Sequence, residues 1–144
     1  MRSRIRQFAH VLERLGLAMA GAASGLFVGA HVGSSIAALT SQAFILVMMV
    51  GGAIGFYLGI DTPQMPFHPN KEGQETDLRG QIDSAEFLSA VGTFMAALTA
   101  FASVGVIVLR SNPHLFWTTM ILFGWIVGVA MQIVAGTMAR LRNR

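Results

Sequence analysis

The sequence predicts an all-α, polytopic integral membrane protein: a compact four-transmembrane-helix bundle forming a single domain, residues 1–144. Of its residues 53% are hydrophobic and 12% are charged, whereas soluble domains carry about 25% charged residues. Four apolar segments approach the roughly 20 residues that cross a bilayer. Glycines recur at every fourth position within these segments. Together these observations favour helices that pack closely in lipid.

The four predicted spans contain no Asp, Glu, Lys or Arg in their interiors. Their approximate bounds are 15–39, 43–60, 87–109 and 115–138. Asp83 with Glu86 resembles a capping box that opens the third span. Asn112 followed by Pro113 predicts the start of the fourth span, as an N-cap followed by proline at the first helical position.

The N-terminal segment has one alternative interpretation. Arg2, Arg4 and Arg6 precede an apolar run, as in a signal peptide. Glu13 and Arg14 interrupt that run, however, and the apolar stretch after them is long enough to span a bilayer. We therefore expect this helix to be retained.

The basic residues predict the orientation of the spans. Four spans place both termini and the loop 61–86 on one side, with nine of the ten Lys and Arg residues, while the other side holds only Arg110. The positive-inside rule then places both termini in the cytoplasm, and we expect a bacterial inner membrane. The loop itself carries six acidic residues against two basic ones. It is either a solvated surface loop or a partner for the basic tails.

The spaced glycines predict close helix–helix contacts of the glycine-zipper type. In lipid, helices associate through close backbone approach, which small side chains allow. The third span uses Ser89, Gly92, Ala96, Thr99 and Ser103 in the same way. The predicted helix-packing glycines are Gly21, Gly25, Gly29, Gly33, Gly51, Gly55, Gly59, Gly124, Gly128 and Gly136. These positions indicate either tight packing alone or helices that slide against one another in a gated pore.

A few polar residues within the spans are candidates for pore or solute contacts. They are Ser24, His31, Thr99, Ser103 and Gln132. His31 and Ser24 share a stripe on the side of the first span away from its glycines. His31 could gate a pore, relay protons or bind a metal, or it could be a neutral, hydrogen-bonded histidine near the far interface. Gln132 is expected to hydrogen-bond between helices or to contact a polar solute.

Glu13 and Arg14 lie side by side at the cytoplasmic edge of the first span. The neighbouring arginines favour an interfacial ion pair. The alternative is a carboxylate that couples transport to an ion.

Several classes of function have no support in the sequence. The chain has no Cys, which excludes thiolate catalysis and cysteine-bound metals. Neither a carboxylate pair within the spans, nor a nucleophile near a base, nor a phosphate-binding glycine loop is recognisable. The basic residues flank apolar segments, so they fit a membrane surface better than nucleic acid. We therefore expect no enzyme, no metal site and no cofactor.

Two functions remain. The first is a small channel or transport protein that works as a homo-oligomer, because the chain is too short to enclose a wide path alone. The second is a non-catalytic transmembrane subunit that packs into a larger membrane complex. In both cases the lipid bilayer and other protein copies or subunits are the expected partners.

Overall fold

The fold is a bundle of four α-helices, and a computed structural model describes residues 2–59 and 84–142 of it. The elements are α1 (Arg2–Ser35), the 3-10 helix η1 (Ala37–Leu39), α2 (Gln42–Gly59), α3 (Ser84–Val108) and α4 (Leu115–Arg142). The described residues contain no strand, so the all-α prediction is confirmed. Each α-helix includes a segment long and apolar enough to cross a membrane.

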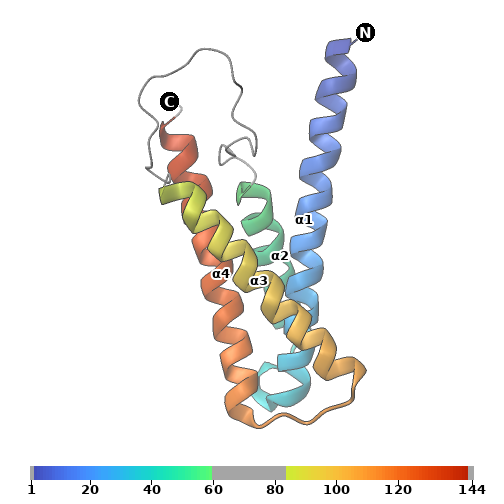
Figure 1. The fold of residues 1–144 in the computed structure, drawn as a ribbon. Coiled ribbons are helices and arrows are strands. Elements are labelled where there is room, and N and C mark those ends of the chain that lie inside the picture. The colour runs from blue at the N-terminus through green and yellow to red at the C-terminus, as the bar shows by residue number, and fades with distance from the viewer. Residues whose placement is uncertain (1, 60–83, 143–144) are drawn as a thin grey trace.

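The helices form two antiparallel pairs, α1 with α2 and α3 with α4 (Figure 1). α1 contacts all three other helices. The start of α1 and the end of α4 lie at one end of the bundle, here named the terminal end, while η1 and the α3–α4 connection lie at the opposite turn end. α1 has 34 residues and α2 has 18, so α1 extends beyond α2 at the terminal end.

The first helix ends at two serines, earlier than the end predicted for the first span. α1 stops at Ser35, before the predicted limit of residue 39. The hydroxyls of Ser34 and Ser35 both donate to the carbonyl oxygen of His31, at 2.8 and 2.9 Å. Ile36 is then extended, and the chain continues as a short 3-10 turn. Serine hydroxyls that bond to nearby backbone carbonyls slightly destabilise a helix, and α1 ends at these two serines.

The turn between α3 and α4 also corrects a prediction. α4 begins at Leu115, later than the Asn112–Pro113 pair indicates, because His114 supplies the cap: its Nδ1 accepts from the Phe116 amide at 3.3 Å. α3 ends in a Schellman-type turn with Arg110 in the left-handed conformation, φ 50°. The predicted Asp83 cap and most of the acidic loop, residues 60–83, lie outside the described residues.

The α1–α2 pair is packed backbone against backbone. A Cβ on Gly21 would overlap the carbonyl of Gly52, and one on Gly52 would overlap the carbonyl of Gly21. A Cβ on Gly25 would overlap the Met48 carbonyl. Towards the turn end, Gly29 contacts Met48 and Ile45, and Gly33 contacts the η1 backbone. From Gly21 to Gly33, this face of α1 therefore lies against α2 and η1.

The α3–α4 pair has a corresponding contact between Gly92 and Gly128. A Cβ on Gly92 would lie 2.6 Å from the Gly128 carbonyl oxygen, and one on Gly128 would lie 2.8 Å from that of Gly92. Gly124 faces the methyl group of Thr99 on the same side of α4. The two helix pairs thus each contain one glycine–glycine contact.

The other four predicted helix-packing glycines lie between α2 and α4. A Cβ on Gly136 would overlap the Leu58 carbonyl, and Gly51 faces the Trp125 ring. Gly55 and Gly59 lie next to Gln132. Gly128 and Gly136 belong to the same four-residue repeat on α4. Gly128 nevertheless contacts α3, whereas Gly136 contacts α2.

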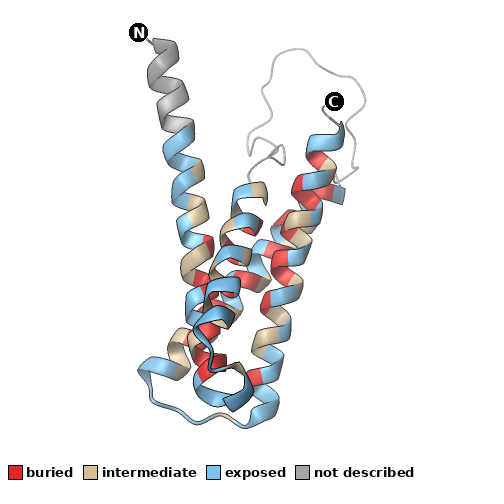
Figure 2. Cartoon of the chain, turned by 180° about the vertical axis from the view of Figure 1, so that it is seen from behind, coloured by how far each residue is buried: buried red, intermediate tan, exposed pale blue. Residues whose placement is uncertain are grey.

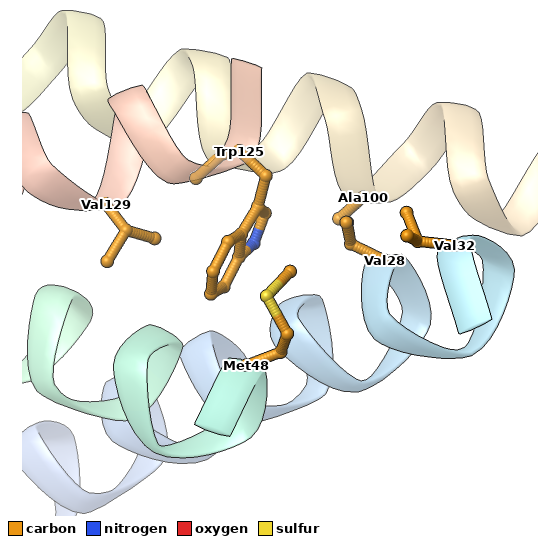
Figure 3. Close-up of a cluster of buried hydrophobic side chains, with 7 residues drawn as sticks. Val28, Val32, Met48, Ala100, Trp125 and Val129 are labelled. Atoms are coloured by element: carbon orange, nitrogen blue, oxygen red, sulfur yellow. The ribbon is translucent and has the colours of Figure 1, made fainter. Parts of the chain in front are cut away.

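The apolar core lies where α1, α2, α3 and α4 meet. It consists of Val28, Val32, Met48, Ala96, Ala100, Trp125 and Val129, and Figure 3 labels all of these except Ala96. Buried positions line the inner faces of the helices, and exposed positions cover the outside (Figure 2). Many of the exposed side chains are large and apolar, as expected for a surface in contact with lipid.

Candidate functional site

Buried polar side chains form a row along the inside of the bundle. They are Ser24 and His31 on α1, Ser89 and Ser103 on α3, and Thr118 and Gln132 on α4. Trp125, whose indole N–H is polar, is also buried. Within each helix these residues are separated by seven positions or by twice seven, and a seven-residue step returns to nearly the same helix face. We call these seven residues the polar column.

At the turn end of the column, His31 meets Thr118. The His31 side chain is 1% exposed, and its Nε2 lies 3.5 Å from the Thr118 hydroxyl oxygen. This contact joins α1 to α4. Ser103 is also buried, and it donates to the Thr99 carbonyl of its own helix at 2.9 Å.

In the middle of the column, Trp125 donates its indole N–H to the Ser24 hydroxyl at 3.2 Å. Ser24 in turn donates to the Gly21 carbonyl at 2.8 Å. The serine therefore uses both its donor and an acceptor site, and the bond joins α4 to α1 in the same layer as the apolar core.

At the terminal end of the column, a chain of hydrogen bonds joins three helices. Gln132 on α4 donates through Nε2 to the Thr93 hydroxyl at 2.8 Å, and Thr93 donates to the Ser89 carbonyl at 2.8 Å. Ser89 donates through its own hydroxyl to the Gly59 carbonyl at 3.3 Å. The bonds connect α4 with α3 and α3 with the end of α2.

One acceptor in this chain is not used. Within the described part of the chain, Gln132 Oε1 is buried and has no hydrogen-bond partner, and the whole side chain is only 1% exposed. An unsatisfied buried acceptor costs about 1–3 kcal/mol. Gln132 Oε1 therefore keeps an unused capacity to accept a hydrogen bond.

Two glycines of α2 form the wall opposite Gln132. A Cβ on Gly55 would lie 2.9 Å from Gln132 Oε1, so glycine is needed there for the amide to reach α2. A Cβ on Gly59 would lie 3.5 Å from the Ser89 hydroxyl oxygen and 3.9 Å from Gln132 Cγ. Position 59 therefore has room for a methyl group beside the polar side chains.

Four of the five sequence candidates for solute contact lie in the column: Ser24, His31, Ser103 and Gln132. Thr99 is half-buried, and its hydroxyl donates within its own helix, to the Met95 and Ala96 carbonyls. Sequence reasoning did not select Thr118, Trp125 or Thr93 as site residues. Thr118 and Trp125 precede Gln132 at steps of seven residues, and this spacing in the sequence could have identified them.

The candidate ion-pair residues lie outside the column, at the terminal end. Glu13 is exposed, and the Arg14 guanidinium carbon lies 5.6 Å from the ring centroid of Tyr57. Arg140 approaches the same ring from α4, at 5.8 Å. A Glu13–Arg14 ion pair stays a prediction. Among the described residues, no three His, Asp or Glu side chains gather closely enough to hold a metal.

Comparison of the chain with family models, with curated proteins and with solved structures finds no match.

Proposed function

We propose that the chain inserts into a membrane as four spans with both termini in the cytoplasm, and that it is a channel or transport protein for a small polar solute. The observation that carries the proposal is the polar column. On α4 it reaches from Thr118 to Gln132, which at 1.5 Å per residue is about 21 Å. The hydrocarbon core of a bilayer is about 30 Å thick.

The composition of the column supports transport over packing alone. Polar groups within a bilayer are expensive to bury, and each must find a partner. The glycine contacts already provide close packing between the helices, without polar side chains. Packing of the helices therefore does not require the polar contacts at the turn end, in the middle and at the terminal end of the column. Nor does it require the unused acceptor of Gln132.

The column is closed within a single bundle, because its side chains are buried and bonded across the helices. A solute can pass only if helices move. Glycine contacts permit sliding because no side chains interlock there, and we propose that the working unit is a homo-oligomer in which neighbouring bundles support this movement.

Solute flux into proteoliposomes tests the proposal. Light scattering would follow the entry of urea, glycerol or ammonium, and the wild-type protein is expected to accelerate at least one of them over protein-free liposomes. Gly59→Ala, which places a methyl beside Ser89 and Gln132 without backbone overlap, should slow that flux about fivefold, equivalent to roughly 1 kcal/mol in the barrier.

The control is Gly105→Ala, because a Cβ there would have no neighbour within 4 Å. It should keep wild-type flux. Equal rates in liposomes with and without the wild-type protein, for all three solutes, would refute transport of this kind.

One observation favours a second function, that of a non-catalytic subunit in a larger membrane complex. The N-terminal half of α1 carries several exposed apolar side chains, namely Val11, Leu12, Leu15 and Met19. Such a helix could pack against another membrane protein. Native mass spectrometry in mild detergent separates the two functions: a defined homo-oligomer is expected for the channel, and a monomer or a mixed complex for the subunit.

A further inference from the structure

A polar contact joins the two helix pairs at each level of the polar column. In the middle Trp125 donates to Ser24, and at the terminal end Ser89 donates to the α2 backbone. At the turn end His31 Nε2 lies 3.5 Å from the Thr118 hydroxyl oxygen, which joins α1 to α4. Of the side chains in these contacts, His31 is the one whose charge ordinarily changes between about pH 5 and 8.

The contact between His31 and Thr118 lies at the mouth of the column. His31 is four residues before the end of α1 at Ser35, and Thr118 is three residues after the start of α4 at Leu115. At 1.5 Å per residue these side chains are about 6 and 5 Å from the helix ends. In the proposed orientation this mouth opens away from the cytoplasm. A change in this one contact would therefore alter access to the column from that side.

A protonated His31 would have no acidic side chain beside it in the described part of the bundle. The described acidic residues, Glu13 on α1 and Glu86 in the first turn of α3, lie at the terminal end. α2 and η1 carry no acidic or basic side chain, and the basic residues of α4 are also at the terminal end. The charged or titratable groups at the turn end are Arg110 and His114, which are exposed in the α3–α4 connection. Both are basic and cannot compensate a charge on His31.

Protonation of His31 would therefore work against the closed arrangement. The imidazolium ring donates through both nitrogens, so Nε2 could no longer accept from Thr118. The side chain is 1% exposed, and a buried charge without a partner is costly. Acid thus favours any arrangement in which the ring reaches water. The glycine contacts hold the helices together within each pair, so the movement is expected between the pairs.

We infer that His31 is a pH-sensitive gate at the turn end of the bundle. At neutral pH its contact with Thr118 keeps the helix pairs together and the column closed. Acid on that side of the membrane separates the pairs and opens the column. The inference rests on the proposed function, because it describes how the proposed path is regulated.

The movement can be measured without any transport assay. The chain has no Cys, so spin labels attach only to cysteines that are introduced. Ala38→Cys on η1 and Thr119→Cys on α4 place labels at exposed positions of the two helix pairs. Double electron–electron resonance on the protein in liposomes should show the label distance lengthening by at least about 3 Å, the diameter of a water molecule. The change is expected between about pH 8 and about pH 5.5, and it should be reversible.

Variants assign the movement to His31. His31→Gln keeps a hydrogen-bonding side chain but gains no charge, so its label distance should be the same at both pH values. His31→Asn, with a shorter amide, is a second neutral variant and should behave alike. His114→Asn is the control, because it removes the exposed histidine of the turn and keeps a residue suited to capping α4. It should retain the wild-type response to pH.

Flux through the column provides the functional measurement. Glycerol and urea do not change charge in this pH range, so a pH dependence of their entry into proteoliposomes reports on the protein. The wild type is expected to admit the solute it accelerates about fivefold faster at the acidic pH, the lower range of coupling between two sites. His31→Gln should lose this difference.

The two measurements distinguish failure of the gate from failure of transport. A label distance that does not depend on pH, or one that still lengthens in His31→Gln and His31→Asn, would overturn the gate whatever the flux. An acid-dependent separation of the labels with no flux of any solute would instead overturn transport and leave the acid-sensitive contact standing.

Discussion

Gly25→Ala is expected to destabilise the bundle by about 3 kcal/mol, the upper range for overpacking a tight interface. The added Cβ would overlap the Met48 carbonyl, which belongs to the α2 backbone. A backbone carbonyl cannot rotate away as the end of a side chain can. The helices must therefore separate, and separation would also break the neighbouring contact between Gly21 and Gly52. Gly25→Val, with a larger side chain, should prevent the folded bundle from accumulating.

The measurement is unfolding of the purified protein in detergent, followed by circular dichroism over a series of temperatures or SDS fractions. Gly16→Ala is the matched control, because Gly16 lies on the same helix and a Cβ there would have no neighbour within 4 Å. It should unfold like the wild type. Equal stability of Gly25→Ala and Gly16→Ala would mean that α1 and α2 do not approach each other as closely as described.

The glycine spacing shows how much of the helix packing could be predicted from the sequence alone. It predicted close contacts for Gly21 and Gly25, and the structure describes their partners as Gly52 and Met48. The partners themselves could not be predicted, because a periodic pattern identifies a helix face but not what covers it. Gly128 and Gly136 share one repeat, yet the first contacts α3 and the second contacts α2. That difference depends on the crossing angles of whole helices.

The polar column shows a similar limit. Gln132 and His31 stand out in the sequence as polar groups in apolar segments. Thr118 does not, because a threonine near the start of a helix is ordinary; its burial and its contact with His31 place it in the column. The predicted start of the fourth span, residue 115, agrees with α4, but its cap was assigned wrongly for a local reason: the His114 ring provides the cap that residue preferences assign to Asn112.

The Trp125 side chain contributes to the stability of the bundle in two ways. It is 3% exposed and belongs to the core cluster with Val28, Met48 and Val129 (Figure 3). Its indole N–H also donates to Ser24. Trp125→Ala would remove a large aromatic group from the point where the helix pairs meet, so we expect a loss of about 3–5 kcal/mol. The loss should appear as a lower unfolding temperature in detergent.

Two further variants separate packing from hydrogen bonding. Trp125→Phe keeps an aromatic ring but cannot donate to Ser24, and the lost bond should account for about 1 kcal/mol, with a further loss from the smaller ring. The control is Trp117→Ala, because Trp117 is 62% exposed on the same helix and should cost far less than Trp125→Ala. In a Trp117→Phe background the remaining tryptophan is Trp125, so its fluorescence reports directly on the core. If Trp125→Ala and Trp117→Ala were equally mild, the helix pairs would not be held together at this core, and a polar column between them would lose its structural basis.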